Sequence, residues 1–351
     1  MKVVMLIDMD YFYVACEELR NPELKNKPTV VGAHPKEGKG RGVVLTCNYA
    51  ARKYGLRSGM PISTAYKLKP DANYLPADFF YYEDKSKEAM AIIRNMCSRM
   101  EQVSIDEAYA AIDSLKDYGE AMAYGEKVKS EIKSKSGLPC SVGISYNKFM
   151  AKMSCESAKP NGIKIVSETE AKGFLNDIPV GKMYGVGSKT GERLERMGYH
   201  TIGDLSHAKI MTLIGEFGSL GLELHNHANG IDESEIIENY DVKSIGREVT
   251  FENDTNDTAL ITKTIEKLSD DTMGDVSKQN LSFRTVTLKV RYHDFTEHLK
   301  SKSIKPSNNS EDIKRVALEL YNLHVNKNIK IRKLGVRVSK LTKYEMQKRL
   351  F

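Results

Sequence analysis

Two stretches in the N-terminal half of the chain place carboxylates beside apolar residues. Val3 to Ile7 are five consecutive apolar residues followed by Asp8, a pattern typical of a buried strand. Residues 104–109 also read as a strand, and they include the neighbouring acids Asp106 and Glu107. Buried carboxylates without partners are costly, so we expect cations next to them. The two strands therefore predict a cluster of Asp8, Asp106 and Glu107 that binds hard cations such as magnesium.

Each of these acidic patterns also has a simpler interpretation. Acidic residues are common in solvated turns, and an Asp that closes a strand is often only a turn former. In addition, neighbouring strand residues face opposite sides of a sheet. Asp106 and Glu107 can therefore share a target only near the end of a hairpin or at a strong twist.

The periodicity of the first 166 residues predicts one α+β sheet. Residues 79–99 form an amphipathic helix, 118–135 a second helix and 141–144 a strand. Residues 11–77 are inserted after the first strand as a small region of short helices and strands. With the strand at 2–8 and the acidic hairpin, this order predicts a ferredoxin-like sheet with carboxylates on two strands.

Residues 167–231 read as helical and contain a glycine-rich turn. Gly185 and Gly187 precede Lys189 in a stretch that resembles a helix-hairpin-helix. Glycines allow close backbone approach, and amides at the start of the next helix suit a phosphate. An ordinary glycine turn between two helices is the alternative interpretation.

The last third of the chain follows a strand–helix–strand–strand–helix–strand pattern. Its elements are strand 245–251, helix 257–273, strand 284–292, a polar strand at 296–304, helix 311–324 and strand 331–339. This is a βαββαβ unit of the ferredoxin-like split type. In strand 284–292 apolar residues alternate with Thr287, Lys289 and Arg291, and Arg337 alternates similarly in the last strand. One face is therefore apolar, and the other carries hydroxyls and cations suited to phosphates.

Charge and composition narrow the class of protein. Residues 244–351 carry 21 Lys and Arg against 14 Asp and Glu, whereas residues 1–243 carry 32 against 33. A basic region beside an acidic cluster indicates a polyanion held by one part and processed by another. No window is long enough for a membrane span, and the five cysteines lack metal-site spacing. We expect a cytoplasmic protein with reduced thiols and no membrane association.

Together these motifs resemble the Y-family, DinB-like translesion DNA polymerases of the DNA polymerase IV type. The matching stretches, in order, are Asp8–Tyr13, Asn48–Gly55, Ser104–Tyr109, Gly143–Lys148 and Ala158–Gly162. The resemblance implies five parts and a C-terminal tail. They are a palm at 1–10 and 78–166, fingers at 11–77, a thumb at 167–233, a linker at 234–243, a little finger at 244–341 and a tail at 342–351.

The resemblance also implies roles for individual residues in DNA synthesis, DNA repair and copying past damaged bases. The metal ligands would be Asp8, Asp106, Glu107 and the Met9 carbonyl, holding two Mg²⁺ ions. The incoming dNTP would be held by Tyr49, Arg52 and Lys159, with Tyr13 as the steric gate against a ribose 2′-hydroxyl. Primer–template DNA would be bound by Gly185, Gly187, Lys189, Arg247, Lys289, Arg291 and Arg337.

Two further features bear on partners. Residues 232–242 are acidic, whereas the linker of many family members is basic. The C-terminal residues Gln347–Phe351 resemble a short peptide that binds a sliding clamp, with a plain basic tail as the alternative. We expect a monomer.

Two other functions use similar residues. A nucleotide cyclase can combine such a sheet with two ions, but it needs neither a helix-hairpin-helix nor a basic terminal domain. A non-catalytic DNA-binding relative of a polymerase would be expected to lack a metal carboxylate, yet Asp8, Asp106 and Glu107 are all present.

Overall fold

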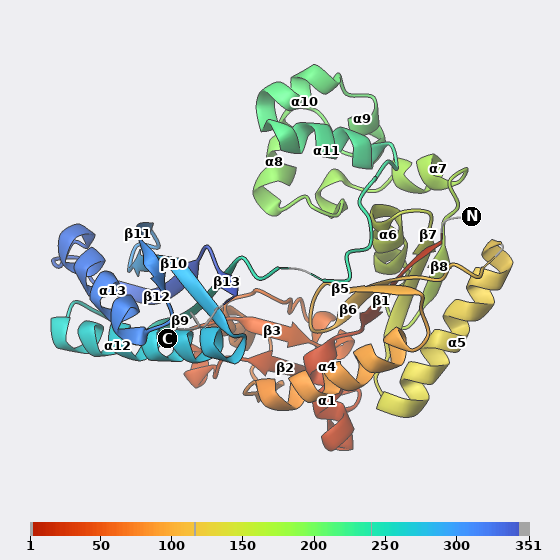
Figure 1. The fold of residues 1–351 in the computed structure, drawn as a ribbon. Helices are drawn as coiled ribbons and strands as arrows, with labels where there is room; N and C mark the ends of the chain where they lie inside the picture. The colour runs from red at the N-terminus through yellow and green to blue at the C-terminus, as the bar shows by residue number, and fades with distance from the viewer. Residues whose placement is uncertain (1–2, 116, 240, 344–351) are drawn as a thin grey trace, which may run out of the picture. The chain divides into compact units, whose positions relative to one another are not determined.

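The computed structural model of the chain describes residues 3–115, 117–239 and 241–343 (Figure 1). The chain divides into two compact units, residues 1–239 and 240–351. Within the described ranges, no helix is long and apolar enough to cross a membrane. The clamp-like motif Gln347–Phe351 lies outside the described residues.

A five-stranded sheet in the order β5-β6-β1-β7-β8 is the centre of the first unit. Its strands are β1 (Val4–Met9), β5 (Arg99–Gln102), β6 (Glu107–Ala111), β7 (Cys140–Ser145) and β8 (Ile163–Ile165). All residues of β1 are buried, as its apolar run predicts. Apart from β8, the sheet is a βαββαβ unit whose first and third strands are central, so the predicted ferredoxin-like palm is confirmed.

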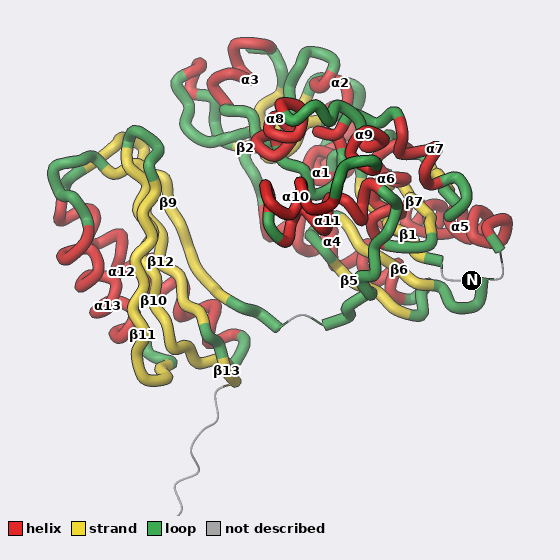
Figure 2. The backbone as a smooth tube through the Cα atoms, turned by 90° about the horizontal axis from the view of Figure 1, so that it is seen from above, coloured by secondary structure: helices red, strands yellow, loops and turns green. Residues whose placement is uncertain are grey.

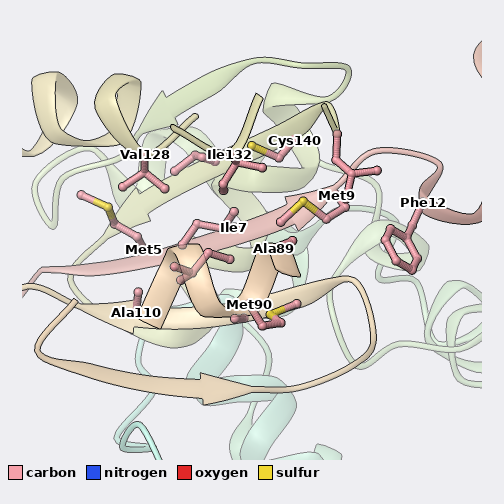
Figure 3. Close-up of a cluster of buried hydrophobic side chains, with 14 of the residues drawn as sticks. Met5, Ile7, Met9, Phe12, Ala89, Met90, Ala110, Val128, Ile132 and Cys140 are labelled. Atoms are coloured by element: carbon pink, nitrogen blue, oxygen red, sulfur yellow. The ribbon is translucent and has the colours of Figure 1, made fainter. Parts of the chain in front are cut away.

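Alternate residues of β1 face different helices. Met5 and Ile7 pack with α4 (Phe79–Arg94) and α5 (Tyr118–Ser136) in the main core (Figure 3). Val4 and Leu6 pack instead with α6 (Lys148–Ala158). The predicted helix at 79–99 ends earlier, at Arg94, because the following residues turn into β5.

Helix α6 lies very close to the sheet because β7 contains a glycine. A Cβ atom at Gly143 would lie 2.1 Å from the Ala151 carbonyl oxygen and 2.2 Å from the Cys155 amide nitrogen. Only glycine permits this approach. Asn147 caps α6 by accepting a hydrogen bond from the Met150 amide at 2.8 Å.

The inserted region between β1 and α4 is a small three-stranded sheet with short helices. Its elements are α1 (Phe12–Arg20), η1 (Pro22–Leu24), β2 (Thr29–Gly32), η2 (Lys36–Gly38), β3 (Val44–Cys47), α2 (Tyr49–Arg52), α3 (Ile62–Leu68) and β4 (Asn73–Leu75). Asn48 caps α2, with its side chain accepting from the Ala51 amide at 3.0 Å. The region has its own small core, which includes Val30, Val44 and Ile62.

Short helices follow β8, as the sequence predicts for residues 167–231. They are α7 (Ala171–Asn176), η3 (Val180–Lys182), α8 (Ser188–Arg196), α9 (Ile202–Ser206), α10 (Ile210–Phe217) and α11 (Ser219–Ala228). Their apolar faces pack against Phe149, Met150 and Met153 of α6.

The acidic segment 232–242, which includes most of the expected linker, is partly held on the palm. Asp232 accepts a hydrogen bond from the Phe149 amide at 2.8 Å, and the Ile237 amide donates to Glu101 at 2.8 Å. Lys148 pairs with the same Glu101 at 2.7 Å. The first half of the segment therefore belongs to the first unit, because its backbone and acids find partners there.

The second unit has the predicted element order, with strands in the order β11-β10-β12-β9. The elements are β9 (Ser244–Thr255), α12 (Thr258–Lys278), β10 (Leu281–Tyr292), β11 (Glu297–Ser307), α13 (Ser310–His324), β12 (Ile331–Ser339) and β13 (Thr342–Lys343). Both helices cover one face of the sheet, which leaves the other face open (Figure 2). The second and fourth strands are central, so the strand order differs from that of the palm and from the ferredoxin-like order expected here.

Candidate active site

The three predicted metal-binding carboxylates come together at one end of the palm sheet. Strands β1 and β6 pair so that Asp8 lies opposite Glu107, and the Met9 amide donates to the Asp106 carbonyl at 2.8 Å. Asp8 continues the series of β1 residues that face α6. Asp106 lies in the bend of the β5–β6 hairpin, before β6 begins. The strict alternation that would separate Asp106 from Glu107 therefore does not apply.

Ser104 organises the hairpin bend. Its hydroxyl donates to the Asp106 carboxylate at 2.7 Å and accepts from the Glu107 amide at 3.1 Å. Burial raises the pKa of Asp106, and the nearby charge of Asp8 adds to this effect. Burial likewise raises the pKa of Glu107, assisted by Asp8 and Asp106. The bend thus gathers negative charge in a place that favours a cation.

Two lysines of the α6 region supply positive charge to this cluster. Lys152 Nζ lies 2.5 Å from Glu107 Oε2 and 3.3 Å from Asp8 Oδ2. Lys159 Nζ lies 2.8 Å from Asp8 Oδ2 and 2.9 Å from Glu156 Oε1. Burial disfavours their charged forms, but the carboxylates outweigh it and raise the pKa of both lysines.

The donor set fits hard divalent ions. Carboxylate oxygens are the ligands that such ions prefer, and the two ammonium groups show that the cluster attracts positive charge. Among the residues that the structure describes, no three Asp, Glu, His or Cys side chains are yet arranged as a complete ligand set. The ammonium groups of Lys152 and Lys159 contact carboxylate oxygens that a bound ion would also contact.

Asp10 is a site residue that the sequence analysis did not identify. It is 1% exposed and accepts hydrogen bonds from the Tyr49 hydroxyl at 3.2 Å and the Asn161 amide at 2.7 Å. The Ser141 hydroxyl donates to it at 3.0 and 3.1 Å. Burial raises the pKa of Asp10, although these hydrogen bonds oppose the shift. Asp10 thus joins β1 to two segments that carry predicted triphosphate ligands.

Tyr49 and Arg52 share one face of α2, as predicted. The guanidinium of Arg52 lies 4.6 Å from the centre of the Tyr49 ring, a cation–π contact. Arg52 Nε also donates to the Cys47 carbonyl at 3.2 Å. Asp10 thus connects Tyr49 to Asn161, two residues after Lys159, and Arg52 lies next to Tyr49.

Tyr13 lies on α1 beside the acidic cluster. Its half-buried ring packs 4.8 Å from the ring of Tyr82 and edge-on to Phe79 at 6.1 Å. Burial raises the pKa of Tyr13, with a further contribution from the charge of Asp106. These contacts fix the plane of the ring next to the carboxylates.

The residues predicted to bind DNA are not all brought together. Gly185, Gly187 and Lys189 are exposed around the turn that begins α8, where added Cβ atoms at the two glycines would meet nothing within 4 Å.

In the second unit, pairing of β10 with β12 puts Thr287 opposite Arg337, so Lys289 and Arg291 share their open face. Arg247 is not brought to them. It lies opposite Val336 and forms an ion pair with Asp275 of α12 on the helix-covered side.

Comparisons with known proteins agree over nearly the whole chain. Residues 7–156 match the impB/mucB/samB family model, and residues 242–350 match the model of that family's C-terminal domain. Residues 181–232 match a model described as the DNA polymerase-iota thumb domain.

Similar curated proteins and solved structures are DNA polymerases. DNA polymerase IV of Methanoculleus marisnigri is 42% identical over 341 residues, covering 97% of this chain and 94% of that protein. DNA polymerase IV 1 of Methanosarcina mazei is 39% identical over 360 residues, covering 100% and 99%. A solved Y-family DNA polymerase chimera of Dbh and Dpo4 superposes with a TM-score of 0.87 at 29% identity, covering 97% of this chain and 99% of the chimera. A solved insertion ternary complex of Dbh DNA polymerase superposes with a TM-score of 0.70 at 28% sequence identity, covering 97% of this chain and 99% of that one.

Proposed function

Because the chain belongs to the impB/mucB/samB family, the Y-family DNA polymerases, we propose how its own residues carry out the family's reaction. The chain is a metal-dependent, DNA-directed DNA polymerase of the translesion type. We assign two Mg²⁺ ions to Asp8, Asp106, Glu107 and the Met9 carbonyl. The register that sets Asp8 opposite Glu107, with Asp106 in the adjoining bend, is the observation that carries this assignment.

The reaction joins a primer 3′-hydroxyl to the α-phosphate of a dNTP and releases pyrophosphate. Divalent ions held by Asp8, Asp106 and Glu107 would stabilise the negative charge that develops on the attacking and leaving oxygens. Arg52 can grip phosphate oxygens as a planar fork, whereas Lys159 acts as a point charge. We propose that Lys159 exchanges its contact with Asp8 for the triphosphate, which frees that carboxylate for an ion.

We propose that Tyr13 discriminates deoxyribonucleotides from ribonucleotides. Its ring is held by Tyr82 and Phe79 and lies beside Asp106. A 2′-hydroxyl on a nucleotide bound at the carboxylates would meet this ring. Ribonucleotides are therefore rejected by a steric clash.

Primer–template DNA is assigned to two surfaces. The turn at Gly185–Lys189 offers exposed amides, and the open face of the second sheet offers Lys289, Arg291 and Arg337. We keep the part boundaries of the family resemblance, with palm at 1–10 and 78–166, fingers at 11–77, thumb at 167–233 and little finger at 244–341. We also propose that the chain acts as a monomer.

Single-nucleotide primer extension tests the metal assignment. Asp106→Ala should lower the rate by about 10³-fold, since divalent ions supply several kcal/mol of transition-state stabilisation. Its affinity for primer–template DNA should stay within about twofold. Asp113→Ala, which removes an exposed acid paired with Arg99 beyond the same hairpin, is the matched control. Extension by Asp106→Ala at the wild-type rate would overturn the assignment.

Two additions to this assay test the copying of damaged template and the binding of a sliding clamp. A template with an abasic site should be copied past the lesion, as a translesion polymerase requires. Deletion of residues 345–351 should abolish stimulation by a sliding clamp if the C-terminal motif binds one, and leave clamp-free synthesis unchanged. The two alternative functions find no support, because the similar curated proteins are DNA polymerases.

A further inference from the structure

The open face of the second sheet carries carboxylates among the cations assigned to DNA. Lys289 of β10 lies opposite Gly335 of β12, and Gly335 lies opposite Glu248 of β9. On the other side of β10, Arg291 lies opposite Glu297 of β11. Glu248 and Glu297 therefore flank the central cations across neighbouring strands.

Both carboxylates are engaged in ion pairs on this face. Lys289 Nζ lies 3.1 Å from Glu248 Oε1 and 3.3 Å from Glu297 Oε1. Glu297 also accepts two hydrogen bonds from Arg291, at 2.5 and 2.9 Å. Glu248 contacts Lys333 as well. Two acids thus neutralise most of the charge of three cations.

A hollow next to these pairs shows where a phosphate backbone can approach. It measures about 310 Å³ and lies over Gly246 and Gly335, which present no side chain on this face. Its rim includes Glu248, Lys289 and Arg337. Within the described residues, Arg337 forms no ion pair, so no carboxylate neutralises its charge at the hollow.

Hydroxyl groups extend this surface toward β11. The hydroxyls of Thr285 and Ser303 are 3.1 Å apart, and those of Thr287 and Ser301 are 2.9 Å apart. Hydroxyls and cations together are the groups that proteins use to contact DNA phosphates. The occupant that fits the hollow is therefore a sugar-phosphate backbone.

We propose that Glu248 and Glu297 act as internal substitutes for DNA phosphates, which hold Lys289, Arg291 and Lys333 until a backbone replaces them. This inference rests on the proposed DNA-binding role of the open sheet face. Each phosphate must displace a carboxylate, so the free energy needed to break the internal ion pair offsets part of the attraction between the cation and DNA. The affinity for DNA should therefore be lower, and should depend less on salt concentration, than the number of cations on this face implies.

A double-mutant cycle on the full chain tests this competition. Binding to a mixed-sequence primer–template duplex is measured by fluorescence anisotropy at several salt concentrations. Glu248→Gln/Glu297→Gln should bind about 3- to 10-fold more tightly at 0.1 M salt, with a slope of log K against log salt steeper by about 1 to 2. The matched control is Asp275→Asn/Glu319→Gln, which removes two paired acids from the helix-covered side.

The cycle is completed with Lys289→Gln. This change should weaken DNA binding less than about twofold in the wild-type chain, where Lys289 is neutralised, but about fivefold or more in the double-Gln background. Equal effects in both backgrounds, or equal tightening by the control pair, would overturn the competition. A separate outcome would show that the DNA-binding assignment itself is wrong. If Arg337→Ala and Lys289→Gln leave DNA affinity unchanged even in the double-Gln background, this face does not bind DNA.

Discussion

Replacing Asp10 by Ala should weaken nucleotide binding without removing any metal ligand. The buried carboxylate holds the hydroxyl of Tyr49 and the amide of Asn161, which follows Lys159 by two residues. Without it, the two segments proposed to bind the triphosphate lose their hydrogen bonds to the end of β1. Asp10 acts as a positioning residue, so its loss should raise the KM for dNTP more than it lowers kcat.

The magnitude follows from the lost hydrogen bonds. A hydrogen bond to a charged group contributes about 1.5–3 kcal/mol net, and donors left buried without a partner add to the cost. If the equivalent of one such bond is lost in positioning, kcat/KM falls by about 10- to 100-fold. Asp10→Asn keeps one acceptor oxygen and should recover part of the loss.

Steady-state incorporation of a single dNTP measures this effect. Ser141→Ala is the control, because it removes a donor to Asp10 that belongs to neither of the proposed triphosphate-binding segments. The control should leave the KM for dNTP within about twofold of wild type. If Asp10→Ala shows an unchanged kcat/KM at an unchanged thermal midpoint, or if Ser141→Ala raises KM equally, the positioning role is wrong.

Three other predictions concern the gate, the helix carrying the lysines and a half-buried histidine. Tyr13→Ala should reduce discrimination between dNTP and rNTP, measured as the ratio of kcat/KM values; an unchanged ratio would remove Tyr13 from the gate. Gly143→Ala should lower the free energy of unfolding in urea by about 1–3 kcal/mol or more, because the new methyl group would overlap the backbone of α6. The control Gly173→Ala, where an added Cβ has open space, should not destabilise the fold. Equal effects of the two substitutions would contradict the close packing. His227 stacks on Phe149 at 4.3 Å, and burial lowers the pKa of His227 below its ordinary value of 6.5, so stability should fall as pH drops through that value. His227→Phe should therefore gain stability relative to wild type at pH 5 but not at pH 8, and a pH-independent difference would refute this.

Local patterns were sufficient to predict most of the elements. The apolar run of β1 and the alternation of Val286, Leu288 and Val290 in β10 are set by burial of one or both strand faces, which leaves a direct trace in the sequence. Helix boundaries were less well predicted. The helix from Phe79 stops at Arg94 because the chain must turn into β5, and that constraint is tertiary.

The roles of individual side chains depended on contacts between distant segments. Asp10 bonds to residues 39, 131 and 151 positions away, so no local pattern indicates its function. The contact of Lys152 with Glu107 depends on the close packing of α6 at Gly143, which the sequence around Lys152 does not indicate. The side taken by Arg247 did have a local signal, since it lies two residues from the buried Ile245 and shares its face.

The paired hydroxyls between β10 and β11 bear on damage tolerance. The exposed hydroxyls of Ser301 and Ser303, each paired with a buried threonine hydroxyl, suit phosphate oxygens, but hydroxyls at a backbone carry no information about base identity. A chemically altered base leaves the sugar-phosphate chain around it largely intact. As a proposed DNA-binding surface, this face would not distinguish damaged from intact bases, so tolerance of a modified template would begin outside the active site.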